Sequence, residues 1–235
     1  MDNLAVFDID GTLIRHLAQG NDRSYVRAFE EVFNITGIVD DPQAWSSFKT
    51  STDSGITCEI YRMRYGRDPL PVELDNFKGR ELALLEGEFR SGELKYEALP
   101  GAGEILGLLG KSFGWDVAIA TGNWEYKGRM KLDSAGVANR EVPMGAAEDG
   151  IERAVIIMSA IGRARKARGA SGYGKTVFIG DRPWDINAAR LLGLPFLGIG
   201  SGADAEELLR EGARAVIDGY SRPDEVAKAL ENSSV

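Results

Sequence analysis

Phe7-Asp8-Ile9-Asp10-Gly11-Thr12-Leu13 is the stretch of sequence that decides the fold. It continues a short apolar run that begins at Leu4 and ends in an aspartate, with a glycine close behind. A brief, β-leaning run of this kind is typical of a buried strand whose carboxyl end carries polar residues. We therefore expect residues 4–7 to form the first strand of a sheet.

Short apolar runs alternate with helical patterns in the second half of the chain, after a break at Leu99-Pro100-Gly101. Strands separated by helices form right-handed βαβ units, which place helices on both faces of a parallel sheet. The sequence thus predicts an α/β fold with a Rossmann-like, three-layer core. The further strands are expected at residues 117–120, 142–145, 176–180, 196–199 and 215–217.

The region between the first strand and the rest of the sheet has a different pattern. Apolar residues recur there at helical spacing, which predicts several amphipathic helices and little strand. The resulting domain prediction is a core domain of residues 1–15 and 98–235 with an inserted α-helical cap domain of residues 16–97. The helical pattern is carried by Tyr25, Phe29, Phe33, Ile56, Ile60, Tyr61, Leu82, Leu85 and Phe89.

Composition and charge exclude several classes of partner. The 235 residues carry a formal net charge of −8, with a pI of about 4.9, so the surface repels nucleic acid and anionic membranes. Cys58 is the single cysteine, which excludes an internal disulfide and a zinc cluster of cysteines. The N-terminus lacks a secretory signal pattern, and no long apolar run is present. We expect a cytoplasmic protein, a monomer or a homodimer, with neither nucleic acid nor membrane as partner.

Polar residues follow three of the expected strands. Asp8 and Asp10 follow the first, Thr121-Gly122-Asn123 follows the second, and Asp181 and Asp185 follow the strand at 176–180. Ligands of an open parallel sheet bind beyond the carboxyl ends of its strands. The first segment lies more than a hundred residues before the other two. All three are nevertheless expected to meet at one edge of the sheet.

Four carboxylates gathered at one edge repel one another unless a cation joins them. Mg²⁺ suits such a site, because it prefers oxygen ligands and keeps several positions for water and phosphate. Asp8 and Asp181 are the expected side-chain ligands. Asp10 would contribute through its backbone carbonyl, and Asp185 would bind through water or orient the other ligands.

FDIDGTL at residues 7–13, ATGN at 120–123 and GDRPWD at 180–185 together resemble the haloacid dehalogenase superfamily, in its phosphatase branch with a helical cap. The resemblance covers nearly the whole chain, and within this branch the chain looks like the phosphoglycolate phosphatases. The resemblance implies that Asp8 attacks phosphorus and forms an aspartyl-phosphate. It also implies that Asp10 is the general acid and base, and that Thr121 and the Gly122 N–H bind the phosphoryl oxygens.

Asp10 distinguishes two reactions within this superfamily. The dehalogenases lack an acid at that position, because a halide leaves without a proton. An alkoxide leaving group needs a proton donor, so the presence of Asp10 favours phosphate chemistry.

A cation that pairs with Asp8 and the phosphate is also implied by the resemblance. Arg153, at the start of the helix after the third strand, is the candidate, although a lysine is commoner there in the superfamily. An arginine keeps its charge and can bind two oxygens at once. Lys127 and Lys131, on the helix after Thr121, are alternatives, and Arg153 could instead be a solvated residue paired with Glu152 or Asp149.

Several further positions have two interpretations each. Thr12 and Gly122 are assigned to substrate binding. Asn123 either caps a helix or contacts the ligand. Thr52 and Asp53 lie in a polar loop that relatives use for specificity, but either could simply cap the next helix. Trp184 could line the entrance to the site or a subunit contact.

The sequence therefore predicts a phosphoric monoester hydrolase that uses Mg²⁺ and acts on a small phosphorylated metabolite, such as one resembling phosphoglycolate. Two alternatives stay open. One is a phosphomutase of the same branch, which would return the phosphoryl group to its substrate. The other is a non-catalytic binding protein with the same fold.

Overall fold

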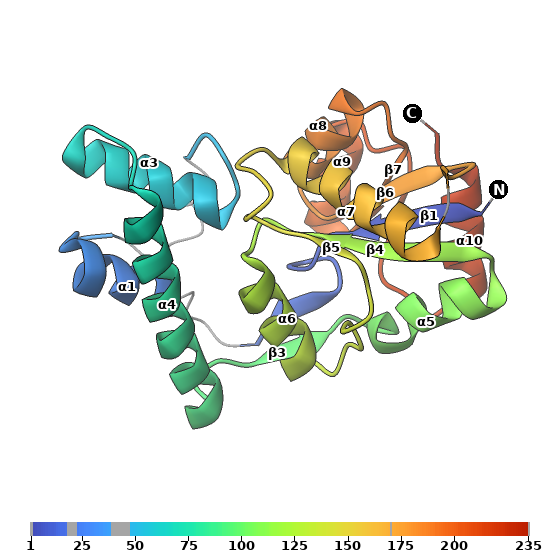
Figure 1. The fold of residues 1–235 in the computed structure, drawn as a ribbon. Coiled ribbons are helices and arrows are strands. Elements are labelled where there is room, and N and C mark those ends of the chain that lie inside the picture. The colour runs from blue at the N-terminus through green and yellow to red at the C-terminus, as the bar shows by residue number, and fades with distance from the viewer. Residues whose placement is uncertain (1, 18–22, 39–47, 170, 235) are drawn as a thin grey trace.

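A computed structural model describes residues 2–17, 23–38, 48–169 and 171–234 (Figure 1). The predicted cap range of 16–97 includes residues 18–22 and 39–47, which lie outside the described residues. None of the described helices is long and apolar enough to cross a bilayer.

A six-stranded parallel sheet forms the core, in the order β5-β4-β1-β6-β7-β8. This order places β1 between β4 and β6, so the segments that follow these three strands end side by side. The α/β prediction with a Rossmann-like sheet is confirmed. The strands are β1 (Asn3–Phe7), β4 (Trp115–Ala120), β5 (Met144–Gly145), β6 (Thr176–Gly180), β7 (Phe196–Ile199) and β8 (Val216–Ile217).

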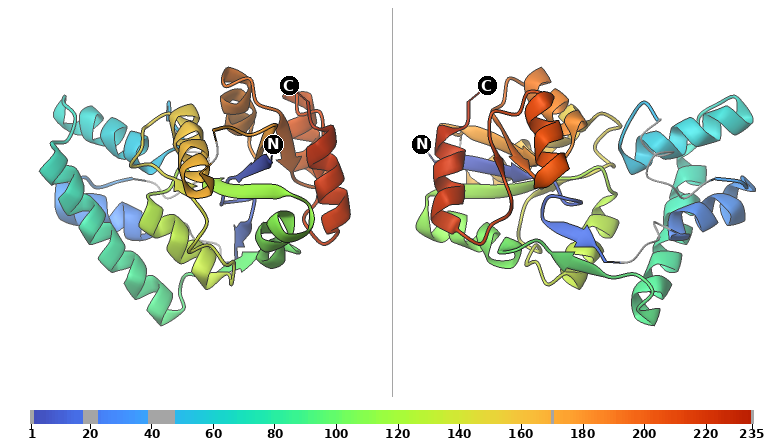
Figure 2. Two further views of the ribbon diagram at one scale, coloured as in Figure 1. Left: turned by 45° about the vertical axis from the view of Figure 1, so that its right-hand side comes forward. Right: turned by 180° about the vertical axis from the view of Figure 1, so that it is seen from behind.

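Helices cover both faces of this sheet, which gives the three layers (Figures 1 and 2). Along β1, Leu4 and Val6 pack in one apolar cluster while Ala5 and Phe7 pack in another, as the alternation of a strand requires. The first cluster includes residues of α7 (Arg153–Arg168), α8 (Pro183–Leu191) and α9 (Gly202–Arg210). The second includes residues of α5 (Ala102–Ser112), α6 (Glu125–Ser134) and α10 (Pro223–Asn232).

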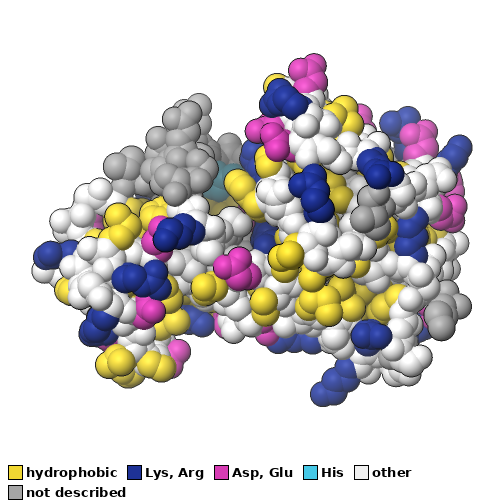
Figure 3. Space-filling model, turned by 90° about the horizontal axis from the view of Figure 1, so that it is seen from above, with side chains coloured by type: hydrophobic (Ala, Val, Ile, Leu, Met, Phe, Trp, Pro, Cys, Tyr) yellow, Lys and Arg dark blue, Asp and Glu magenta, His cyan; other side chains and the backbone are white. Residues whose placement is uncertain are grey.

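The inserted region is helical, as its apolar spacing indicates. It contains α1 (Arg23–Phe33), α3 (Asp53–Tyr65) and α4 (Pro71–Ser91), which lie together to one side of the sheet core (Figures 1 and 2). Seen from above, this helical group and the sheet core form two lobes (Figure 3). Aromatic side chains of the helical group, including Phe29 and Phe77, form a cluster that also contains Trp124 from the core.

Two short strands at the base of the helical group were not predicted. β2 (Ile14–His16) and β3 (Tyr96–Ala98) pair antiparallel, and Arg15 forms an ion pair with Glu97 across them. Three-residue strands are too short to show an alternating pattern, so the sequence carries no signal for them. They cross the predicted domain boundaries at 15/16 and 97/98, and they bring the two connections between the lobes together.

Candidate active site

Asp8 continues the line of β1 at the carboxyl edge of the sheet. Its backbone N–H donates to the Ile179 carbonyl at 2.9 Å, so the residue is held by β6 although it lies beyond the strand. Gly11 then turns the chain with a φ of 75°, and a Cβ at this position would lie 2.0 Å from Asp181 Oδ2. A glycine is therefore required for the loop after β1 to approach the loop after β6.

Three carboxylates meet at this edge. Asp8, Asp181 and Asp185 each offer an oxygen within 4.8 Å of the others, and their residues are only 4%, 8% and 0% exposed. The pKa of Asp8 is raised to about 7, chiefly by burial, while Arg153 opposes the rise and the carboxylates of Asp185 and Asp10 add to it. Burial, followed by the carboxylates of Asp185 and Asp8, raises the pKa of Asp181 well above its usual value. Concentrated negative charge of this kind favours a bound dication.

Arg153 lies against two of these carboxylates. It is the first residue of α7, and its Nη2 is 3.1 Å from Asp8 Oδ2 and 2.9 Å from Asp185 Oδ1. Its Nε also donates to Asp185 Oδ1, at 3.0 Å. The side chain is 10% exposed, so the solvated alternative for Arg153 does not match this placement. Arg153 is thus the cation that the structure places beside Asp8.

Thr121, Gly122 and Asn123 form the loop between β4 and α6. Thr121 Oγ1 accepts from the Asn123 backbone N–H at 3.1 Å and from its Nδ2 at 2.8 Å. A Cβ on Gly122 would lie 2.4 Å from the Ser51 carbonyl oxygen and 3.0 Å from Arg153 Nη1. The missing side chain therefore lets the loop meet both Arg153 and the helical group.

Asp10 faces this loop rather than Asp181. Its Oδ2 accepts from Asn123 Nδ2 at 2.6 Å, and both of its carboxylate oxygens lie 3.1 Å from Lys131 Nζ. The Asp10 side chain is 44% exposed, whereas that of Lys131 is 6% exposed. Asp10 consequently has a buried cationic partner, while its own carboxylate is partly exposed.

Lys127 has a different environment, although it precedes Lys131 by one helical turn. Its side chain is fully buried, and its Nζ lies 3.5 Å from both Asp53 Oδ1 and Glu81 Oε1, which belong to α3 and α4. Lys127 therefore links the helical group to the core, and it is not the cation next to Asp8.

The predicted substrate residues Thr52 and Asp53 bind their loop to the core. Thr52 caps α3 by accepting from the Gly55 N–H at 3.1 Å, and its hydroxyl donates to the Ile151 carbonyl at 3.0 Å. The Asp53 N–H donates to the Gly122 carbonyl at 2.7 Å, and Asp53 Oδ2 accepts from the Trp124 N–H at 2.9 Å. The helix-capping interpretation thus describes Thr52, and contact with substrate stays a prediction for both residues.

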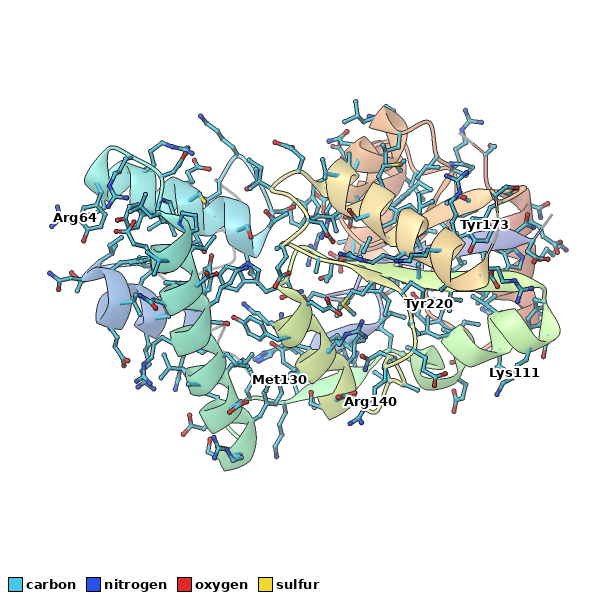
Figure 4. The ribbon with its side chains drawn as sticks, in the orientation of Figure 1. Arg64, Lys111, Met130, Arg140, Tyr173 and Tyr220 are labelled. Atoms are coloured by element: carbon cyan, nitrogen blue, oxygen red, sulfur yellow. The ribbon has the colours of Figure 1, made fainter. Side chains whose placement is uncertain are left out.

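Thr12 lies behind the carboxylates. It is fully buried, and its hydroxyl donates to Asp181 Oδ1 at 3.4 Å. Tyr220, which is labelled in Figure 4, donates its hydroxyl to the Thr12 carbonyl at 2.9 Å. This placement suits a residue that holds Asp181, and no sequence signal connects Tyr220 to the site because it lies 208 residues away.

A cavity of about 960 Å³ opens over these groups. Trp184 lines it and is 38% exposed, which agrees with the entrance interpretation of this residue. The cavity brings together residues from both lobes. Among the residues that line it are Asp8, Asp10, Arg15, Tyr25, Ser51, Asp53, Tyr96, Thr121, Asn123, Lys131, Arg153, Asp181 and Asn187.

Solved structures resemble the chain over almost its whole length. A hydrolase from Pseudomonas syringae is 21% identical, with a TM-score of 0.61 over 97% of this chain and 99% of that one. A HAD (haloacid dehalogenase) hydrolase of family IA, variant 3, from Entamoeba histolytica is 16% identical, with a TM-score of 0.60 over 98% and 100%. The chain has the haloacid dehalogenase fold.

A predicted phosphatase from Clostridium acetobutylicum is also similar to the chain. It is 20% identical, with a TM-score of 0.58 over 98% of this chain and 99% of that one. No protein-family model matches the chain, and no curated protein sequence does. At these identities the likeness establishes the fold alone.

Proposed function

We propose that this chain is a Mg²⁺-dependent phosphatase that hydrolyses a small phosphomonoester through an aspartyl-phosphate on Asp8. The observation that carries the proposal is the contact of Arg153 with both Asp8 and Asp185, beside Asp181 and in a cavity that Thr121 and Asp10 also line. A nucleophilic carboxylate, a fixed cation, a hydroxyl donor and a second, more exposed carboxylate are the groups that phosphoryl transfer requires.

The carboxylate set fits Mg²⁺. Asp8 and Asp181 would supply side-chain oxygens, and Asp10 would supply its backbone carbonyl. Asp185 would orient the other ligands without binding the ion directly. It is fully buried and already accepts hydrogen bonds from Arg153 and from the Arg182 N–H at 3.2 Å. When bound, the ion would offset the repulsion between Asp8 and a phosphate dianion.

The first step forms the covalent intermediate. A carboxylate oxygen of Asp8 attacks phosphorus, and the bond between phosphorus and the leaving oxygen breaks. The electron pair goes to the leaving oxygen, which takes a proton from Asp10. Arg153, the Thr121 hydroxyl and the Gly122 N–H would hold the phosphoryl oxygens, and the N-terminal end of α6 favours an anion there.

The second step releases phosphate. A water oxygen attacks phosphorus and gives a proton to Asp10, while the bond from Asp8 to phosphorus breaks and its electron pair returns to the carboxylate. The enzyme is then restored, because Asp10 again carries the proton that the next leaving group needs.

The domain assignment belongs to the same proposal. Residues 1–15 and 98–235 would form the catalytic core, and residues 16–97 would form a cap that excludes water until the second step. Thr52 bonds the Ile151 carbonyl and Asp53 bonds the Gly122 carbonyl, so cap position and phosphoryl binding would be coupled.

A screen of phosphorylated metabolites with and without Mg²⁺ tests the proposal. We expect turnover of at least one phosphomonoester, its loss on chelation, and loss by a factor of about 10³ or more in Asp8→Asn. Glu207→Gln provides a matched control, because it changes a carboxylate that lines the cavity outside the cluster of Asp8, Asp181 and Asp185. Activity retained by Asp8→Asn, or failure of the folded wild type on every substrate, would contradict the proposal.

The same screen separates a phosphatase from a phosphomutase. A mutase would need a bisphosphate and would return the phosphoryl group to the substrate instead of releasing inorganic phosphate. We expect phosphate release without any bisphosphate.

A further inference from the structure

We propose that Lys131 is a positioning residue that holds the carboxylate of Asp10 for proton transfer to the leaving group. The inference rests on the proposed function, since it concerns the acid of that reaction. It assigns to Lys131 a role that its sequence position does not reveal.

The contacts of Lys131 fix the orientation of Asp10. Its Nζ lies 3.1 Å from each carboxylate oxygen of Asp10, so rotation of the carboxylate would lengthen one of the two contacts. The ammonium also donates to Asn123 Oδ1 at 2.9 Å, and the ring centroid of Tyr96 lies 5.3 Å away. Hydrogen bonds to charged groups are stronger than neutral ones, so this arrangement is well defined.

Asn123 connects the lysine to the phosphoryl site. Its Oδ1 must face Lys131, because an ammonium can only donate. Its Nδ2 is thereby directed at Asp10 Oδ2, at 2.6 Å, and at Thr121 Oγ1, at 2.8 Å. Lys131 thus orients the proton donor and, through Asn123, the hydroxyl that would bind the transferring group.

The exposure of the two partners separates this pair from an ordinary structural ion pair. Burying a lysine is unfavourable unless a carboxylate accompanies it, so pairing alone would explain the contact. A purely structural pair, however, has no need for one partner to open into a cavity. Here Asp10 is 44% exposed and lines the cavity next to Asp8 and Thr121.

Charge development in the first step gives the contact a chemical consequence. Asp10 becomes a carboxylate as its proton moves to the leaving oxygen, and the adjacent ammonium stabilises that charge. A displaced Asp10 would transfer the proton less well. The loss should be greatest for strongly basic leaving groups, which depend most on protonation.

A series of substituted phenyl phosphates, assayed with Mg²⁺, tests this consequence. For Lys131→Met we expect kcat/KM to fall by about tenfold on p-nitrophenyl phosphate, whose leaving group is weakly basic. On p-methoxyphenyl phosphate the fall should be about 100-fold or more. Lys131→Arg keeps the charge and should show an intermediate dependence on the leaving group.

Lys127→Met is the matched control, because Lys127 lies on the same helix and is also buried and paired with carboxylates. Its rates can fall, but their dependence on the leaving group should stay that of the wild type. In an Asp10→Ala background, Lys131→Met should not change the dependence of kcat/KM on the leaving group any further.

The outcomes separate this inference from the function on which it rests. Failure of the wild type on every phenyl phosphate and on every metabolite of the screen would contradict the proposed function, and this inference with it. Wild-type turnover with an equal loss on all substrates in Lys131→Met would contradict only the role of Lys131. If Lys131→Met does not fold, as judged by circular dichroism, an equal loss in Lys131→Arg has the same meaning.

Discussion

Lys127 and Lys131 occupy successive turns of one face of α6, and both are almost fully buried beside carboxylates. Lys127 contacts Asp53 and Glu81 of the helical group, whereas Lys131 contacts Asp10 at the end of β1. The two lysines thus have two different roles, although they are the same residue type, are similarly buried and lie on the same helix face. The carboxylate partner decides which role each lysine has, because Lys127 joins the two lobes and Lys131 would serve the reaction.

Among the contacts that the structure describes, Lys127 is paired with two carboxylates, those of Asp53 and Glu81. Glu81 is fully buried and accepts from the Tyr126 hydroxyl, while Lys127 Nζ lies 4.8 Å from the ring centroid of Tyr25. Burial, followed by the charge and hydrogen bond of Glu81, raises the pKa of Tyr126, and burial followed by Asp53 raises that of Tyr25. Both phenols therefore stay neutral, and Lys127 is the cation that the described contacts place between the two carboxylates.

The largest expected effect comes from removing the partner of Lys131. Asp10→Asn should lower kcat by about 10²- to 10⁴-fold, because the amide cannot donate a proton as an acid does. Its stability should fall less than that of Lys127→Met, because Asp10 is 44% exposed and the amide oxygen can still accept from Lys131, although the buried lysine loses a charged partner. Kinetics and thermal denaturation of the same preparation check both parts, and a large loss of stability with ordinary kcat would reverse the comparison.

Removing the other lysine should mainly affect stability. Lys127→Met leaves the fully buried Glu81 and the 13% exposed Asp53 without this cation, which should lower the free energy of unfolding by about 3 kcal/mol. A second change, Glu81→Leu, should restore part of the loss, because it removes one of the carboxylates. Denaturant titration of both variants measures this, and an additive loss in the double variant would contradict the shared network.

A smaller effect should follow from the pH dependence of stability. The pKa of Asp8 is about 7 in the folded protein and about 3.8 when unfolded, so the folded state binds more protons between these values. The free energy of unfolding without Mg²⁺ should therefore fall as pH rises from about 4 to 7, by on the order of 1 kcal/mol or more.

Mg²⁺ should counter this fall, because it binds the ionised carboxylates. Its stabilising effect should be larger at pH 8 than at pH 5, and Asp8→Asn should reduce both the pH dependence and the response to Mg²⁺. Thermal denaturation at the two pH values measures the difference. An equal response at both would contradict the metal site at Asp8.

The sequence predicted those features that follow from strand order. Asp8, Thr121 and Asp181 could be brought together in advance, because each follows a strand of one parallel sheet. The partners of Lys127 and Lys131 could not, since Asp53 is 74 residues from one and Asp10 is 121 residues from the other. Their choice depends on how α6 is rotated against its neighbours, and helical periodicity does not specify that rotation.

Loops and short strands show the same limit. The Thr52 and Asp53 pattern suited both substrate contact and helix capping, and only their distances to Gly55, Ile151 and Gly122 distinguish these interpretations. β2 and β3 were missed because pairing between distant segments, rather than local preference, creates them.

Direct detection of the phosphorylated carboxylate tests the central claim. The protein would be mixed with a hydrolysable phosphomonoester and Mg²⁺, quenched in acid during turnover, reduced with borohydride, and analysed by peptide mass spectrometry. Reduction converts an aspartyl-phosphate to homoserine, and we predict this change at Asp8 and its absence in Asp8→Asn. Turnover with no modified residue, or with the modification elsewhere, would contradict the account.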